Sequence, residues 1–60
     1  MILLHRKTKQ GHSQYFLEIR EGSVFGTTAI QNARTFRTYE QAESMKTVIA
    51  NVVEYDVETV

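Results

Sequence analysis

A single stretch with helical periodicity, residues 38–52, limits what the rest of this chain can build. Thr38 is followed three residues later by Gln41, a spacing that allows the two side chains to cap the first turn of a helix. Asn51 suits the left-handed conformation that often ends a helix. Apolar residues recur at intervals of three and four and form one stripe: Ala42, Met45, Ile49 and Val52. A lone helix with one apolar side needs a surface to cover, so we expect a sheet from the remaining residues.

The chain has 60 residues, no cysteine and a net charge of zero. A domain of this size buries about 60% of the surface that its unfolded chain exposes, so its stability margin is thin. Neither a disulfide nor a cluster of cysteine and histidine ligands for zinc is present to compensate. We therefore predict one domain over residues 1–60 that binds no metal or cofactor and gains stability from association, with a homodimer favoured.

The residues before the helix are patterned as strands. Two short apolar runs surround a polar segment that contains a glycine, and together they predict a hairpin: 1–7, 14–20 and the loop 8–13. If the strands pair symmetrically about this loop, Leu4 lies beside Leu17 on the face that the helix covers. The same register places Leu3 and Phe16 on the opposite face, exposed to solvent.

A second turn includes Glu21 and Gly22 and leads into a third strand over residues 23–28. Two loop lengths are open. A three-residue loop that ends in a left-handed glycine turns Phe25 inward, whereas a two-residue loop turns Val24 inward. We favour the three-residue loop, because glutamate is a poor fit to the positive φ that a two-residue turn requires.

Ile30, Ala33 and Phe36 are spaced by three, which predicts a single helical turn tucked under the main helix. After the helix, apolar and acidic residues alternate in a half-buried strand: Val53, Tyr55 and Val57 with Glu54, Asp56 and Glu58. The expected fold is α+β, a sheet of three to four mostly antiparallel strands with one helix on one face, in the order β-β-β-α-β. The position of the C-terminal strand in the sheet is left open.

Charge is unevenly distributed along the chain. Six basic and two acidic side chains precede Thr38, and one basic and five acidic side chains follow it. If the C-terminal strand lies beside the first strand, its acids come close to His5 and Lys7. The two parts of the chain then neutralise each other.

Several of these positions together resemble a group of very short proteins encoded by phages and prophages, most of uncharacterised function. They are Tyr15-Phe16-Leu17 and Phe25, the series Ile30, Ala33, Phe36 and Thr38, the segment Glu40 to Glu43 with Ala42 at its centre, and the closing Tyr55 and Val57. Small phage proteins of this size include stoichiometric inhibitors of host enzymes or defence systems, such as anti-CRISPR proteins. The resemblance therefore implies a modulator or inhibitor of a host protein, acting in the host cytoplasm.

The predicted outer face of the sheet has an apolar centre and a charged rim, which is the usual anatomy of a protein interface. The candidate partner-binding residues are Leu3, His5, Phe16, Glu18, Arg20 and Val24. Open strand edges offer a second route to association. We interpret the chain as a non-enzymatic protein-binding module, and whether it binds a second copy or a different protein is open.

The alternative is a small nucleic-acid-binding protein. Basic residues cluster around the first hairpin loop, and an exposed Phe16 could stack on bases. The residues concerned are Arg6, Lys7, Lys9 and His12. The neutral total charge and the acids that follow the helix count against this reading, because phosphate neutralisation supplies most of such affinity.

Catalysis and membrane insertion find little support. His12 and Ser13 are neighbours in a loop, and no third group is placed in the sequence to orient the histidine. The alternating carboxylates of residues 54–58 are spread along one strand, whereas hard cations need oxygens gathered around one point. No apolar run approaches the roughly 20 residues of a membrane span. We expect a soluble cytoplasmic protein with no catalytic residues.

Overall fold

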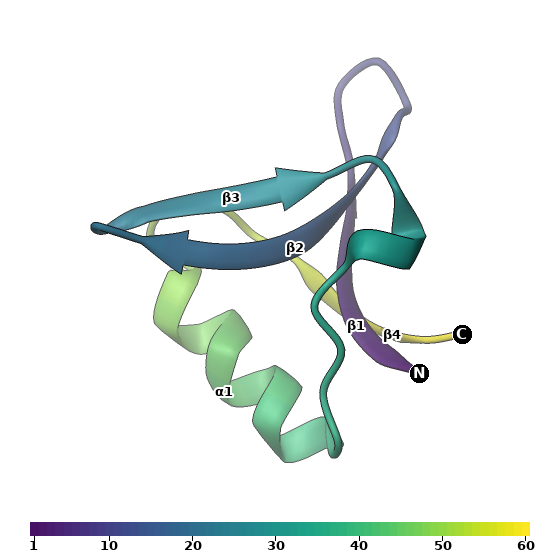
Figure 1. The fold of residues 1–60 in the computed structure, drawn as a ribbon. Helices are drawn as coiled ribbons and strands as arrows, with labels where there is room; N and C mark the ends of the chain where they lie inside the picture. The colour runs from purple at the N-terminus through teal and green to yellow at the C-terminus, as the bar shows by residue number, and fades with distance from the viewer.

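The computed structural model of this chain describes residues 1–60 and confirms the predicted α+β fold. Four antiparallel strands form one sheet in the order β3-β2-β1-β4, and one α-helix packs on one face (Figure 1). The elements are β1 (Ile2–Lys7), β2 (Ser13–Arg20), β3 (Ser23–Thr27), α1 (Tyr39–Ile49) and β4 (Asp56–Thr59). The C-terminal strand pairs with β1, which settles the position that the sequence left open.

The helix α1 begins where the sequence predicts. Thr38 is the N-cap residue, and its hydroxyl oxygen accepts a hydrogen bond from the backbone N–H of Gln41 at 3.2 Å. The amide oxygen of Gln41 accepts from the N–H of Arg37 at 3.1 Å rather than from that of Thr38. Both side chains therefore satisfy backbone donors at the start of the helix, but the return bond is displaced by one residue.

The helix ends at Ile49, and its cap, Ala50, lies one residue before the predicted cap, Asn51. Ala50 caps it in a right-handed conformation, and Asn51 does not adopt the predicted left-handed one. The N–H of Val52 donates to the carbonyl oxygen of Ile49 at 2.9 Å. This turn leaves the side chain of Val52 in solvent, contrary to its predicted place in the apolar stripe. The stripe that faces the sheet consists of Ala42, Met45 and Ile49.

The register of the first hairpin differs by one residue from the predicted one. His5 pairs with Tyr15, so the connecting loop contains the five residues 8–12 instead of six. The N–H of Thr8 closes this loop by donating to the carbonyl oxygen of His12 at 2.8 Å. Because side chains alternate between faces along a strand, a shift of one residue turns the side chains of β2 up to Phe16 to the other face.

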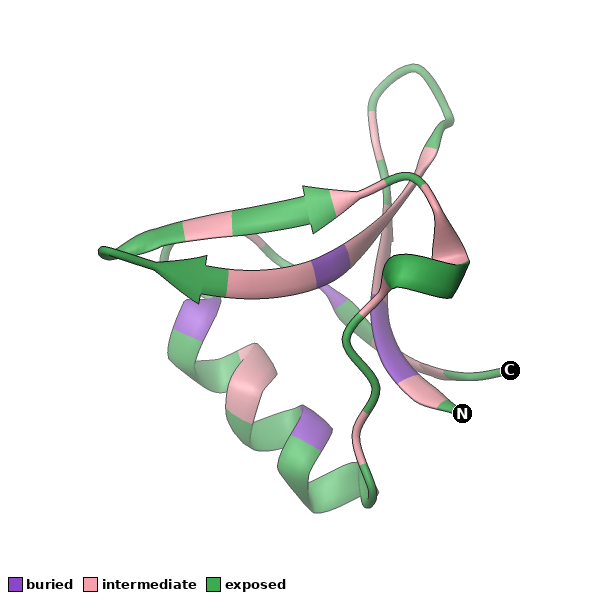
Figure 2. Cartoon of the chain, in the orientation of Figure 1, coloured by how far each residue is buried: buried purple, intermediate pink, exposed green.

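Phe16 is therefore buried, and its predicted exposure on the outer face is wrong. Its side chain is 1% exposed and packs with Leu4 in the core beneath α1. Figure 2 shows how few positions of the chain are buried. The ring meets that of Tyr55 edge to face, with 6.1 Å between the centroids. Leu17, which was expected to face the helix beside Leu4, lies outside this buried core.

Leu3 is also fully buried, although it points away from the helix. The two strands of the hairpin diverge toward this end, and the connection from β3 to α1 lies between them. The N–H of Arg34 donates to the carbonyl oxygen of Phe16 at 2.9 Å, and that of Phe36 donates to Ile2 at 2.8 Å. These bonds hold the connection against the sheet beside Leu3. The predicted exposure of Leu3 is wrong for this reason.

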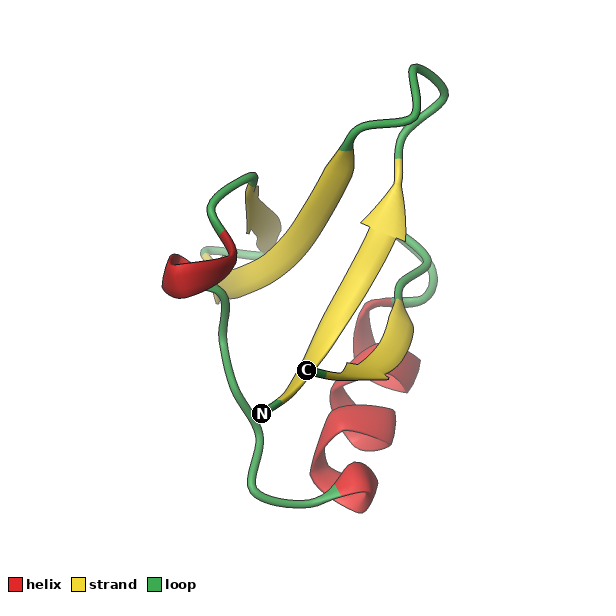
Figure 3. Ribbon diagram, turned by 90° about the vertical axis from the view of Figure 1, so that its right-hand side faces the viewer, coloured by secondary structure: helices red, strands yellow, loops and turns green.

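A short 3₁₀ helix, η1 (Ile30–Asn32), lies on the opposite side of the sheet from α1 (Figures 1 and 3). The single turn predicted from the spacing of Ile30, Ala33 and Phe36 is thus present in part, but it does not lie under the main helix. Ala33 leaves the turn in an extended conformation. Of the three, only Phe36 packs against the core.

The second turn contains only residues 21–22. Glu21 and Gly22 have φ values of 51° and 79°, as a type I′ turn requires. The three-residue loop favoured above is therefore wrong. A primed turn matches the twist of the two strands, which offsets the unfavourable conformation of Glu21. Consequently Val24 packs against the core and Phe25 is exposed on the outer face.

A β-bulge in β2 changes which side chains face the helix. The pairing with β3 shifts between Phe16 and Glu18, so Leu17 is the additional residue. Beyond the bulge, Ile19 pairs with Val24, and both line the inner side of the sheet. The inner face of β2 thus carries two apolar residues three positions apart, Phe16 and Ile19.

Candidate functional site

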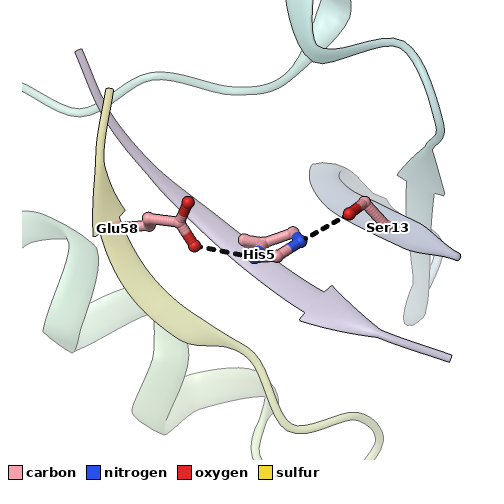
Figure 4. Close-up of polar contacts among 3 residues, drawn as sticks. All are labelled: His5, Ser13 and Glu58. Carbon is pink, nitrogen blue, oxygen red and sulfur yellow. Dashed lines mark hydrogen bonds and ion pairs between the residues drawn. The ribbon is translucent and has the colours of Figure 1, made fainter. Parts of the chain in front are cut away.

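Three side chains from three adjacent strands form a hydrogen-bonded series on the outer face of the sheet (Figure 4). His5 on β1 lies in the centre, with Nδ1 2.7 Å from Oε2 of Glu58 on β4 and Nε2 2.9 Å from Oγ of Ser13 on β2. The ring of Tyr15 stacks on the imidazole, with 5.0 Å between centroids. The imidazole is thus fixed from three sides.

The donors and acceptors of this series follow from its chemistry. A carboxylate only accepts, so the Nδ1–H of His5 donates a hydrogen bond to Glu58, and in the neutral ring Nε2 accepts one from the hydroxyl of Ser13. This is the order of hydrogen bonds in a nucleophile activated by a base and an orienting acid. The sequence did bring an acid near His5, which Glu58 confirms. The sequence offers His12 as the candidate base beside Ser13, whereas the histidine that contacts Ser13 in the structure is His5.

A nucleophile also needs a cleft that holds the substrate beside it. The two surface grooves of this protein are lined by residues other than Ser13, His5 and Glu58. The carboxylate end is open to water, since the side chain of Glu58 is 45% exposed. We interpret the series as structural: its side-chain hydrogen bonds link β4, β1 and β2 on the outer face of the sheet.

The residues predicted to bind a protein partner do not form one surface. They are Leu3, His5, Phe16, Glu18, Arg20 and Val24. Leu3 and Phe16 are buried, so the apolar centre of the predicted interface is absent from the outer face. Val24 packs against the core from the inner side. Glu18 and Arg20 remain accessible near the second turn.

These two charged residues belong to a small cluster at the end of the β2–β3 hairpin. The guanidinium of Arg20 is 2.7 Å from a carboxylate oxygen of Glu18 and lies 5.9 Å from the centre of the Phe25 ring. Exposed ion pairs contribute about 0–1 kcal/mol, and exposed cation–π contacts a similar amount. The cluster orders the outer side of the hairpin without closing it.

The basic residues predicted for nucleic-acid binding are divided between two faces. Arg6 donates to the side chain of Gln14 at 2.8 Å, while Lys7, its neighbour on β1, points to the other side of the sheet. Lys9 and His12 are exposed in the first loop. The aromatic side chain expected to stack on bases is in the core. No single basic surface with a stacking platform results.

An apolar groove runs along α1; its larger part lies between the helix and the segment that contains Arg34 and Phe36, and its smaller part lies between the helix and the β2–β3 hairpin. Its two parts meet at Val48, a helix residue that is 65% exposed, and the larger part has a volume of about 540 Å³. The apolar side chains that line it are Ile19, Val24, Phe36, Met45, Val48, Ile49 and Val52. Arg34 and Glu40 stand at one end of it. This surface, called the apolar groove below, is the largest hollow of the molecule.

The part of the groove beside the hairpin exists because one helix cannot cover four strands. α1 packs mainly against β1 and β4, so the inner side of the β2–β3 hairpin is only partly covered. The sequence placed Met45 and Val52 in the stripe that faces the sheet. It gave no indication that the helix would lie toward one side of the sheet, because strand order decides which strands are covered.

The sheet has two open edges of different character. β3 is one edge, and its sequence, Ser-Val-Phe-Gly-Thr, contains no charged residue. β4 is the other edge, and two of its four residues are the acids Asp56 and Glu58. An edge strand presents unpaired backbone groups, and charged side chains normally protect it from other chains. Only β4 has this protection.

Comparisons with family models, with curated proteins and with solved structures found no match to this chain. The helices are too short and too polar to cross a lipid bilayer. No three side chains among His, Cys, Asp and Glu are gathered so as to hold a metal ion.

Proposed function

We propose that this chain is a non-enzymatic protein-binding module and that its partner occupies the apolar groove. The observation that carries the proposal is the exposure of Val48 and Val52 beside Ile19, on the part of the inner face that α1 leaves open. Residues of both charges, Arg34 and Glu40, stand at one end of the groove. An apolar centre with a polar rim is typical of protein interfaces.

The resemblance to short phage proteins adds a biological role to this binding. A stoichiometric modulator or inhibitor acts by occupying a surface of its target and needs no cleft of its own for chemistry. We therefore include in the proposal that the partner is a host protein whose activity the bound chain changes. The partner would contribute apolar side chains to the groove and polar groups to its end.

The free energy gained by covering the groove is too small to hold a partner by itself. Covering three side chains that are about half exposed contributes about 1 kcal/mol each, or roughly 3 kcal/mol together. Association costs an estimated 4–15 kcal/mol or more in lost freedom of motion. A partner must therefore make further contacts, and the polar end of the groove and the hairpin beside it are the nearest sources. The groove supplies the centre of a larger interface.

Substitution of Val48 by lysine tests the proposal. The side chain is exposed near the C-terminal end of α1, where lysine is compatible with both the helix and its dipole, so the fold should persist. Val60→Lys is the matched control, since Val60 is 56% exposed and outside the groove. Circular dichroism and thermal melting should show both variants folded.

Affinity capture from host lysate with the three proteins gives the functional comparison. The proposal expects at least one protein to be retained by the wild type and by Val60→Lys and to be lost with Val48→Lys. Retention that is equal for all three proteins would contradict the groove as the binding surface. Recovery of no specific protein by the wild type would contradict the proposed function itself.

A further inference from the structure

The open edge of β3 has backbone groups in a defined pattern. Residues that flank a two-residue turn exchange hydrogen bonds with each other, so Ser23 is bonded to β2. Peptide groups alternate in direction along a strand, and those of Val24 and Gly26 therefore point away from the sheet. Two residues of β3 thus offer N–H and C=O groups that have no partner in this chain.

We propose that β3 is the site at which two copies of this chain associate, as antiparallel strands about a two-fold axis that passes through Phe25. In this register Val24 of each copy bonds with Gly26 of the other. The two Phe25 side chains lie directly opposite each other on the outer face. Each is 44% exposed in the single chain, and cross-strand aromatic pairs stabilise a sheet.

The charges of the two edges select this pairing over the others. Two copies joined through β4 would bring Asp56 and Glu58 of one chain against the same acids of the other, which repel. Joining β3 to β4 leaves one open edge of each kind, so copies would continue to add and form a filament. Pairing of β3 with β3 closes after two copies. It leaves only the acidic edges exposed, and these resist further addition.

The size of the core also favours association. Only six of the 60 residues are buried, and the accessible surface of 4297 Å² exceeds the roughly 4,000 Å² expected for a monomer of this mass. A two-fold axis perpendicular to the sheet keeps both helices on one face of an eight-stranded sheet. Val24 lines the apolar groove and also belongs to the pairing edge. The grooves of the two copies therefore approach each other across the new strand pair.

This inference goes beyond the proposed function and does not depend on it. In the dimer, the second copy occupies the edge of β3, and the apolar groove of each copy stays free to bind the proposed host protein. Val48→Lys, which tests the groove, should leave the dimer unchanged because Val48 lies on the helix. Failure of partner capture and failure of dimerisation are therefore separate results.

The first experiment measures mass against concentration by analytical ultracentrifugation. The wild type and Val60→Lys should pass from 6.9 kDa to twice that mass as concentration rises. Phe25→Lys places two like charges opposite each other and removes the aromatic pair, so its dissociation constant should increase by roughly tenfold or more. Both substitutions replace an exposed apolar residue by lysine, and they differ in their distance from the pairing edge.

The second experiment reads the strand pairing directly in the unmodified chain, by hydrogen exchange of single amides followed by NMR. The amides of Val24 and Gly26 should exchange slowly in the dimer and rapidly when the protein is diluted to monomer. A monomer at all concentrations would overturn the proposal and leave the edge to a strand of a different protein. A dimer in which these two amides exchange rapidly, or assemblies larger than two, would overturn it as well.

Discussion

The phenol oxygen of Tyr55 lies 2.9 Å from the point that a β-carbon on Gly26 would occupy. The carbonyl oxygen of Tyr15 lies 3.2 Å from the same point. Gly26 sits opposite Phe16 in the sheet, and the ring of Tyr55 packs edge to face on Phe16. Glycine is therefore required at this position by the close approach of a core side chain, and not by a turn or a positive φ.

Substitution of Gly26 by alanine should destabilise the protein. Alanine would ordinarily stabilise a strand relative to glycine by about 0.5–1 kcal/mol. Here the added methyl group must displace the Tyr55 ring, and overpacking of this kind costs about 1–3 kcal/mol. Urea denaturation should show the loss. Ser23→Ala, at an exposed position of the same strand, is the control and should change stability little.

A double-mutant cycle with Tyr55→Phe identifies the atom responsible. Removing the phenol oxygen opens the space beside Gly26, so alanine should cost less in that background than in the wild type. Part of the destabilisation by alanine should remain in the Tyr55→Phe background, because the close contact with the Tyr15 carbonyl oxygen is still present. If the two backgrounds give equal losses, the phenol oxygen is not what excludes a side chain at position 26.

The same tyrosine makes stability depend on high pH. Burial raises the pKa of the Tyr55 phenol above its ordinary value of 10.0, and the positive charge of Arg6 lowers it to a smaller extent. The folded chain therefore keeps this proton at a pH at which the unfolded chain releases it. The stability that the protonated Tyr55 phenol gives the folded chain is fully present below pH 10.0. It is lost as the pH rises from there through the higher pKa of the folded state. Urea midpoints between pH 8 and pH 11 (about the range that brackets a phenol) should fall at the upper end.

Tyr55→Phe should remove most of this fall, because phenylalanine has no proton to release. Tyr39→Phe, at an exposed position on α1, is the control and should leave the fall in place. Equal pH profiles for the wild type and Tyr55→Phe would show that other groups cause the loss.

Several parts of this structure could be read from the sequence because each depends on neighbours in the chain. The helix start follows from Thr38 and Gln41, three residues apart. The contact between Glu58 and His5 follows only if the acidic strand is placed beside the first strand, a placement that the sequence left open and the structure confirms. Predictions from propensity, capping and charge depend on nearby residues or on summed charges. They therefore stay correct even when the predicted strand register is wrong.

The candidate site was mispredicted because the register of the first hairpin differs by one residue and because β2 does not alternate regularly. Leu17 was assigned to the helix face, and regular alternation would place Ile19 there as well, but the bulge at Leu17 leaves only Ile19 on that face. Phe16 and Ile19 face inward instead, three residues apart. A bulge leaves no sign in the hydrophobic pattern of a strand whose residues 15–17 are all apolar or aromatic. The apolar groove, which depends on Ile19 and on strand order, could not be predicted for the same reason.

Truncation of the two central residues of β2 checks this register. Phe16→Ala removes a side chain from the core and should cost about 3–5 kcal/mol, which is close to the whole stability of a small domain. Leu17→Ala alters a residue outside the buried core and should cost clearly less. The comparison is made by thermal melting and, for Phe16→Ala, by the loss of dispersed NMR signals. A larger loss for Leu17→Ala would favour the register predicted from the sequence.

The turn between β2 and β3 offers a stabilising substitution. Glu21 has a φ of 51°, and a left-handed conformation costs residues other than glycine, asparagine and aspartate roughly 1 kcal/mol. Asparagine followed by glycine is the preferred pair for a type I′ turn, so Glu21→Asn should raise the free energy of unfolding by about 0.5–1 kcal/mol. Glu21→Gln is the matched control, because it removes the same charge and keeps the unfavourable backbone. If both variants gain equally in urea denaturation, the gain comes from the lost charge and not from the backbone of the turn.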